Sequence, residues 1–271
     1  MRGSVVTALI AMLFLAALTF AENATAAESE WKFGASVYGW FPDISGKTAF
    51  SDATDGDEFE IDVKDILDNL EFTFQGGLDA RKGRWGFATD LIYMSVGASQ
   101  RASRDGTIGG NEIPVDVSAR VELDMKSWIW TTAGYYRAVD EANASFDVLA
   151  GVRYIDVEQK LDWSLSGNVG DIPLPGREGG GKATLSNWDF IVGVRGRFLF
   201  GADSAWYVPY YLDIGTGDSD FTWQGAAGLG YAFGWGELSG VWRILSYELD
   251  SDRAIADMEF NGPAIGATFR W

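Results

Sequence analysis

The chain has 271 residues with no Cys and no His, and its 21 basic and 39 acidic residues give a net charge of −18. The lack of Cys excludes disulfides, thiol chemistry and a lipid-modified cysteine, and the negative charge argues against nucleic-acid partners. Without His the chain lacks the usual acid–base catalyst near neutral pH. We therefore predict no enzyme and no cofactor.

Residues 1–27 are predicted to form a secretory signal peptide. Arg2 precedes a continuous apolar run from Val5 to Phe20, and small residues follow, which is the order of a Sec-type signal. The run of about 16 residues is short for a membrane-spanning helix, which needs roughly 20. We expect cleavage after Ala21 or near Ala26–Ala27, leaving residues 28–271 as the folded protein.

The first part of the mature chain is predicted to contain a strand, a long acidic insert and a hairpin. The strand is Trp31–Phe41, and the insert Pro42–Leu70 carries eight acids between Asp52 and Asp68. Its segment Val63–Leu70 spaces apolar residues as a helix does, so we expect one short helix in this first long loop. From residue 71 to 93, apolar and polar residues alternate around the turn Lys82–Gly83, which predicts the hairpin.

The middle of the chain is predicted to hold three strands and two Gly-rich loops. The loops are Gly97–Asn111 and Ser166–Lys182, and the strands span about 113–138, 146–163 and 188–200. In the first of these strands the apolar positions are odd up to Met125 and even from Trp128 onward. Because a strand keeps one parity on each face, we expect a β-bulge near Met125–Ser127.

Four more strands are predicted at about 206–214, 221–233, 238–247 and 258–271. In the last one, Ile265, Ala267, Phe269 and Trp271 alternate with small or polar residues up to the end of the chain. Such an aromatic end resembles the final strand of bacterial outer-membrane β-barrels. That resemblance implies that these four residues form the signal read by the barrel-assembly machinery during insertion.

These elements predict an all-β, antiparallel, up-and-down transmembrane β-barrel of about ten strands. Short turns fall near residues 82, 140, 202 and 235, and longer loops near 50, 105, 175, 217 and 253, which is the asymmetry of outer-membrane barrels. Eight to twelve strands are compatible with the pattern, and twelve would require a hairpin within Lys47–Val63. After residue 27 no apolar run suits a transmembrane helix, so membrane entry requires a closed barrel.

Two features indicate which face of the strands meets lipid, since a soluble barrel alternates equally well. Trp and Tyr cluster near strand ends, as interfacial girdles do. The other face carries too many charges for a dry core. We expect these charges to form a salt-bridge network in a polar lumen: Asp79, Arg81, Asp90, Arg137, Arg153, Asp189, Arg195, Arg197, Asp213, Arg243 and Arg270. The alternative is a charged constriction that passes or binds small anions, favoured by the excess of Arg.

Three other patterns give weaker signals. Gly176–Lys182 nearly matches a phosphate-binding loop, but Ala183 stands where the motif needs Ser or Thr. The acidic run Asp52–Asp68 lacks the spacing of a calcium loop, so no metal site is predicted. Asp79 and Asp90 could form a carboxylate pair, but neighbouring Arg residues would keep both ionised and therefore poor acids.

Several stretches of the chain occur together in an order known from other proteins: Tyr38–Pro42 (YGWFP) with Ile44–Gly46, Asp65–Leu70 (DILDNL), Ala80–Asp90 (ARKGRWGFATD) with Leu91–Tyr93, Ala150–Tyr154 (AGVRY), Asp220–Tyr231 (DFTWQGAAGLGY) and Asn261–Trp271 (NGPAIGATFRW). Together they resemble a widespread, largely uncharacterised family of Gram-negative outer-membrane β-barrel proteins. The family usually has Tyr-Arg-Tyr where this chain reads Trp242–Ile244 (WRI), and it usually ends on Phe. The resemblance implies location and architecture, and it supplies no established activity.

The sequence therefore predicts a non-enzymatic integral protein of the outer membrane, either structural or a narrow pore with an Arg/Asp-lined lumen. The alternative is a surface binding or adhesion module that acts through the loops at 42–69 and 166–182. The expected partners are the lipid bilayer, lipopolysaccharide, the barrel-assembly machinery and small solutes, and the expected state is a monomer.

Overall fold

The computed structural model describes residues 30–48, 57–61, 70–108, 113–169, 172–173, 177–201, 204–249 and 255–271. The predicted signal peptide and most of the acidic insert lie outside these ranges. The predicted helix at Val63–Leu70 also lies outside them, except that Leu70 begins a strand. The described residues contain no helix long and apolar enough to cross a bilayer.

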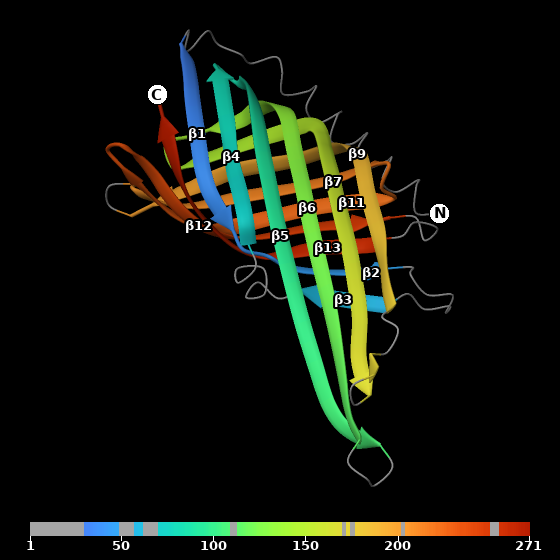
Figure 1. Cartoon of the computed structure of the whole chain (residues 1–271). Coiled ribbons are helices and arrows are strands. Elements are labelled where there is room, and N and C mark those ends of the chain that lie inside the picture. The colour runs from blue at the N-terminus through green and yellow to red at the C-terminus, as the bar shows by residue number, and fades with distance from the viewer. Residues whose placement is uncertain are drawn as a thin grey trace.

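Ten strands close into one antiparallel barrel (Figure 1). Strand β1 pairs with both β4 and β13, and every other neighbour in the ring follows the order of the chain. The predicted all-β, up-and-down barrel of ten strands is therefore confirmed. The ring consists of β1 (Trp31–Trp40), β4 (Leu70–Lys82), β5 (Trp85–Ile108), β6 (Ile113–Asp140), β7 (Ala144–Val169), β9 (Arg177–Phe200), β10 (Trp206–Gly217), β11 (Phe221–Phe233), β12 (Gly236–Glu248) and β13 (Ile255–Arg270).

A hairpin of two short strands, β2 (Asp43–Thr48) and β3 (Asp57–Ile61), extends the wall beside β13 without entering the ring. Strand β1 pairs with β4 only as far as Val37 opposite Gly76. Beyond this point the side-chain amide of Gln75 accepts from Trp40 N at 2.6 Å and donates to Trp40 O at 3.2 Å. A side chain thus replaces main-chain pairing where β1 gives way to β2. The short β8 (Ile172–Pro173) pairs with the end of β7.

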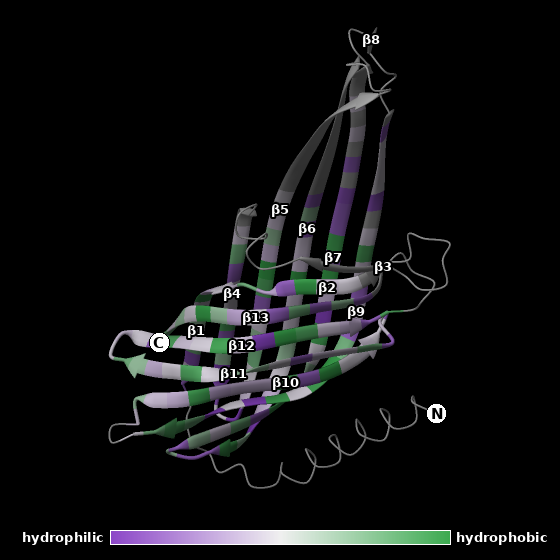
Figure 2. Cartoon of the chain, turned by 90° about the horizontal axis from the view of Figure 1, so that it is seen from below, coloured by the Kyte–Doolittle hydropathy of each residue, from purple (hydrophilic) through white to green (hydrophobic). Residues whose placement is uncertain are grey.

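Four consecutive strands are much longer than the rest and project beyond the barrel (Figures 1 and 2). Strands β5, β6, β7 and β9 have 24 to 28 residues, whereas β10 to β12 have 12 or 13. The predicted loops Gly97–Asn111 and Ser166–Lys182 are therefore largely strand, and their assignment as loops was wrong. Pairing with a neighbouring strand satisfies the backbone groups of a polar, Gly-containing segment, so low apolar content does not prevent strand formation.

The bulge predicted near Met125–Ser127 does not exist, because β6 pairs with β5 from Ile113 to Tyr136 without a register shift. Met125 and Ile129 are buried, whereas Trp128 and Trp130 are exposed. Odd residues of β6 therefore face inward on both sides of the expected bulge. The apolar parity changes because, along β6, the inward residues change from apolar to polar while the outward residues change from polar to apolar.

The outer face of the barrel is rich in exposed aromatic and aliphatic side chains. Near the chain ends, the rings of Phe33 and Trp271 stack at 6.0 Å, and those of Trp235 and Phe269 lie 5.5 Å apart. Bands of hydrophobic and hydrophilic residues alternate along the strands (Figure 2). The face that the sequence assigned to lipid is therefore the one that points away from the barrel interior.

Candidate functional site

The barrel interior is divided along its axis into an apolar half and a polar half. The apolar half lies on the side from which the long strands project, and it brings side chains from eight strands into one buried cluster. Each of these side chains is at most 7% exposed, so this part of the interior is packed. We call it the apolar layer: Trp40, Ile44, Ile92, Met94, Met125, Ile129, Ile155, Val157, Leu185, Leu245, Tyr247, Leu249, Met258, Phe260 and Ala264.

A fully buried ion pair lies next to this layer. Arg153 on β7 pairs with Asp213 on β10, and both side chains are 0% exposed. The guanidinium also donates to the hydroxyls of Thr131 at 3.2 Å and Thr222 at 3.4 Å. Such bonds from several strands are needed to offset the desolvation of two buried charges. The pair therefore ties four strands together inside the barrel.

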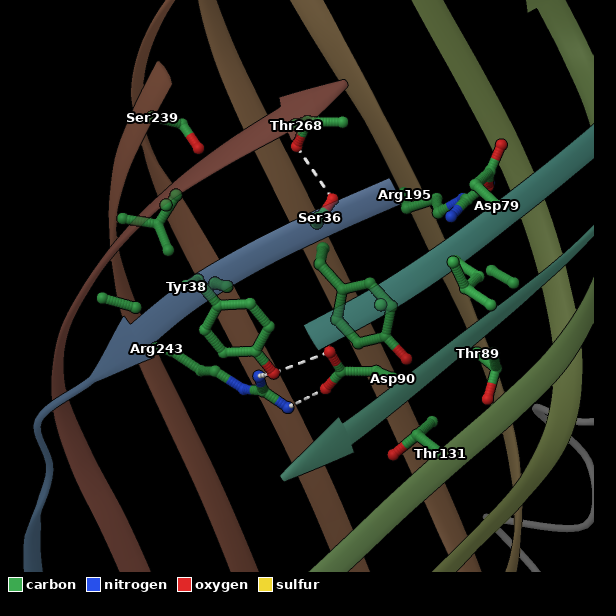
Figure 3. A pocket seen from close by; sticks show the side chains of 18 of the residues that line it. Ser36, Tyr38, Asp79, Thr89, Asp90, Thr131, Arg195, Ser239, Arg243 and Thr268 are labelled. Atoms are coloured by element: carbon green, nitrogen blue, oxygen red, sulfur yellow. Dashed lines mark hydrogen bonds and ion pairs between the residues drawn. The ribbon is translucent and has the colours of Figure 1, made fainter. Parts of the chain in front are cut away.

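A second cluster joins β1, β5, β11 and β12 (Figure 3). Asp90 accepts a hydrogen bond from the Tyr38 hydroxyl at 2.6 Å and one from Arg243 at 3.0 Å. Arg243 also donates to Gln224 at 3.0 Å and lies over the ring of Trp40, 4.7 Å from its centroid. Trp40 belongs to the apolar layer, so this cluster marks the inner end of the polar half.

A third cluster, centred on Arg195, lies nearer the rim where β1 begins and β13 ends. Arg195 pairs with Asp79 on β4 and with Asp147 on β7, the latter at 3.3 Å, and its guanidinium lies 3.9 Å from the Tyr135 ring centroid. Asp147 also accepts from Arg137 at 2.7 Å. Because β4 and β9 are not neighbours in the ring, the Arg195–Asp79 pair crosses the interior.

At the rim where β1 begins and β13 ends, one carboxylate accepts hydrogen bonds from two guanidiniums. Glu237 accepts from Arg197 at 2.6 Å and from Arg270 at 2.9 and 3.0 Å. The side chains of Arg197 and Arg270 are 33% and 48% exposed. Solvent therefore reaches the two guanidiniums, whereas the Glu237 side chain between them is 9% exposed.

Two connected chambers occupy the polar half. The mouth chamber, at the rim, has a volume of about 690 Å³ and is lined by all three members of the rim cluster. The middle chamber, of about 330 Å³, reaches Asp90 and Arg243 (Figure 3). Asp79 and Arg195 line both chambers and so stand between them. The interior is thus a two-part polar recess that ends at the apolar layer.

Each of the seven predicted lumen Arg residues forms an ion pair with a carboxylate. Ten of the eleven predicted charges make such pairs, and the exception is Asp189, which accepts from the backbone and hydroxyl of Ser219, both at 2.9 Å. Arg81 pairs with Asp140 at 3.4 Å. The seven are Arg81, Arg137, Arg153, Arg195, Arg197, Arg243 and Arg270.

The sequence prediction missed three acids of the network, namely Asp140, Asp147 and Glu237. Asp147 shares the parity of Arg153, and Glu237 shares that of Arg243, so strict alternation would have found both. Asp140 lies at the end of β6, where alternation has no further residue to support it. With these acids included, seven Arg face seven acids, and the overall Arg excess that favoured an anion pathway disappears.

The predicted insertion residues lie on the outer face of β13. Ile265, Phe269 and Trp271 are 65%, 47% and 67% exposed, and Ala267 is partly buried. Their role as an insertion signal stays a prediction. Among the described residues, no group of three or more acidic side chains is placed to hold a metal ion.

A scan of family models finds no match to this chain, and neither does a search of curated proteins. A search of solved structures finds matches that include Ail, the attachment invasion locus protein of Yersinia pestis. Its identity to this chain is 10% over 89% of this chain and 98% of that one, and the TM-score is 0.31. The translocator domain of autotransporter NalP from Neisseria meningitidis is 12% identical over 100% and 98%, with a TM-score of 0.33. A Pseudomonas aeruginosa FadL homologue is 8% identical over 90% of each chain, with a TM-score of 0.28.

These solved proteins are outer-membrane β-barrels. Scores this low carry no conclusion about function, and the family resemblance of the sequence stays a prediction.

Proposed function

We propose that this chain is a non-enzymatic, integral outer-membrane β-barrel that is closed to the passage of solutes. The observation that carries the proposal is the apolar layer, which packs the interior of the barrel where a pore would need a continuous aqueous path. The polar recess on the other side of this layer then opens at one end only.

The outer surface supports the membrane location. Phe190, Leu78 and Val37 are 74%, 60% and 61% exposed on the outer face, and a closed barrel leaves no strand edge unpaired around its ring. In water such a surface would expose a large apolar area, whereas lipid covers it. In this proposal the rim with the short turns, where β1 begins and β13 ends, faces the periplasm, and the long strands project from the other side of the membrane. Export by the Sec route, insertion by the barrel-assembly machinery, contact with lipopolysaccharide and a monomeric state belong to this proposal.

Conductance in planar bilayers tests the closed barrel. Refolded protein of residues 28–271 is expected to give no channel events above the background of the bilayer. Replacing Ile129, Ile155 and Phe260 together with Ser would place polar groups in the apolar layer, and we expect this variant to conduct if it folds. Reproducible, ion-selective events from the wild-type protein would contradict the proposal and support the narrow pore.

The membrane location has its own test. We expect the mature protein to require detergent for extraction and to migrate differently on a gel before and after heating, because a barrel resists unfolding by detergent alone. Recovery from the periplasm as a soluble monomer without detergent would show that the lipid-facing assignment is wrong.

A second candidate function, binding at the cell surface, is favoured by the projecting strands. The outer strands of the projection are β5 and β9. Pairing of β5 with β4 ends at Val96, and pairing of β9 with β10 ends at Asp189. Both outer strands of the projection thus have an edge without a strand partner in the part of the chain that the structure describes. Such edges accept strands of other chains. Removing residues 99–121 without any change in adhesion, phage sensitivity or envelope integrity would count against this function.

A further inference from the structure

We propose that the mouth chamber binds a small solute that carries a phosphate or carboxylate group and enters from the rim where β1 begins and β13 ends. This inference adds a binding site to the proposed function. It depends on the chemistry of the chamber and not on whether the apolar layer blocks conductance, so the two proposals can fail separately.

The charge of the chamber is opposite to that of the protein. Its lining contains six basic side chains, Lys32, Arg81, Arg137, Arg195, Arg197 and Arg270, and three acidic ones, Asp79, Asp147 and Glu237. Asp140, which pairs with Arg81 and Arg137, adds a fourth acid beside the lining. Even without Lys32, five Arg face four acids here, in a chain whose net charge is −18.

This excess is confined to the mouth. The middle chamber is lined by two cations, Arg195 and Arg243, and two anions, Asp79 and Asp90. Of the seven Arg and seven acids of the network, five Arg and four acids lie at the mouth, and two Arg and three acids lie deeper in the barrel. The interior therefore attracts anions at its entrance and becomes neutral further in, which favours binding at the mouth over passage.

The rim cluster supplies suitable donors. Arg197 uses one terminal nitrogen to bind Glu237, and Arg270 uses Nε and one terminal nitrogen. A guanidinium has five N–H donors in a planar fork, so one shared carboxylate leaves both side chains with donors for an anion. Phosphate and carboxylate are the groups that such forks bind most effectively.

The shape of the chamber favours a free solute over a lipid headgroup. The chamber lies inside the ring of strands and holds about 690 Å³, with the inward-facing Tyr207 and Tyr211 in its lining. Lipid would contact the opposite, outward face of the same strands. The aromatic rings add apolar surface for the body of an organic anion, and the exposed Arg side chains leave the entrance open to water.

Binding of inorganic phosphate to the refolded mature protein tests this inference, measured by calorimetry at low salt in a zwitterionic detergent. We expect one saturable site, with affinity that falls as salt screens the charges. Arg197→Gln should weaken binding about tenfold, the effect of losing one charge-assisted contact. Glu237→Gln should tighten it, because the competing carboxylate is gone. Succinate should compete with phosphate for the site.

Arg84→Gln is the matched control. Arg84 is an exposed cation at the same rim that lies outside the chamber lining, so this change should leave phosphate binding unaltered. Heat-dependent migration verifies the fold of each variant, and Arg197→Lys, which keeps the charge, replaces Arg197→Gln if the latter does not fold. We then expect a loss of affinity smaller than tenfold, because a charge remains.

Three outcomes would overturn the inference. The first is an absence of saturable phosphate binding by the wild-type protein at low salt. The second is an equal loss in Arg84→Gln and Arg197→Gln, which would indicate non-specific attraction to the rim. The third is that the protein binds no free phosphate but does bind anionic lipid, so that nanodiscs of phosphatidylglycerol give binding and nanodiscs of phosphatidylcholine do not. That last result would assign the rim cations to a lipid headgroup.

Discussion

Three strands change from a charged to an apolar inward residue over a single step of two positions. On β5 the change runs from Asp90 to Ile92, on β7 from Arg153 to Ile155, and on β12 from Arg243 to Leu245. The boundary between the polar half and the apolar half of the interior therefore lies at one level of the barrel. Alternation decides which side chains face inward, whereas the level along the axis decides their polarity.

The two halves are stable for different reasons. In the apolar half, dispersion and the removal of apolar surface from water stabilise the packing. In the polar half, buried charges are tolerated because each guanidinium pairs with a carboxylate, and Arg153 and Arg243 also donate to neutral side chains. A charge placed in the apolar half would lack partners, and an apolar residue placed in the polar half would leave the charges around it unpaired. Substitutions in each half therefore test this difference.

Removing one partner of the fully buried pair should cost the most. Asp213→Ala leaves Arg153 charged and without its carboxylate, and we expect the free energy of unfolding to fall by about 3–5 kcal/mol. Reversible denaturant unfolding in detergent micelles measures this change. Asp79→Ala is the comparison, because the Asp79 side chain is 27% exposed and water can solvate what remains. Equal costs for the two variants would mean that burial does not distinguish the clusters.

A cavity in the apolar layer should cost slightly less. Leu245 is 0% exposed, so Leu245→Ala should lower the free energy of unfolding by about 2–5 kcal/mol through lost transfer energy and an unfilled space. Leu229→Ala makes the same chemical change at an outward position that is 46% exposed, and we expect a smaller effect in micelles. If Leu245→Ala were as mild as Leu229→Ala, the apolar layer would be loosely packed and the closed interior would be in doubt.

A single methyl group should disturb the polar half through overpacking. A Cβ on Gly86 would lie 2.1 Å from the ring of Tyr135, which packs against Arg195. We expect Gly86→Ala to cost about 1–3 kcal/mol, and Tyr135→Leu to relieve part of that cost in a double-mutant cycle. Gly134→Ala is the control, because its Cβ would approach no heavy atom closer than 4.0 Å. Additive costs would show that the ring does not require this glycine.

The rim cluster should contribute least to stability. Glu237→Gln removes the carboxylate shared by Arg197 and Arg270, and these guanidiniums are 33% and 48% exposed. We therefore expect a change of about 1 kcal/mol or less, as for other solvent-accessible ion pairs. Denaturant unfolding at low and high salt measures it. A loss as large as that of Asp213→Ala would show that the rim cluster is a structural element and not a solvated one.

Much of the fold could be predicted from the sequence because a strand exposes its two faces in strict alternation. Ten strands, the turn at Lys82–Gly83, the outward aromatic residues and the inward Arg and Asp residues follow from this period. The bulge near Met125–Ser127 was wrong for the opposite reason. It assumed that one face keeps one polarity along its whole length, which holds for a face that meets lipid but not for an interior that changes from charges to apolar packing.

Local alternation and the turns between neighbouring strands were enough to predict an all-β barrel, about ten strands in its ring and which residues point inward. Tertiary structure alone decided which inward residues meet. Arg153 finds Asp213 across β9, and Arg195 reaches Asp79 across the interior. It also decided that Arg197 and Arg270 share Glu237 at an open rim. Closure of the ring brings residues that are far apart in the chain into contact, and a local sequence pattern contains no information about such contacts.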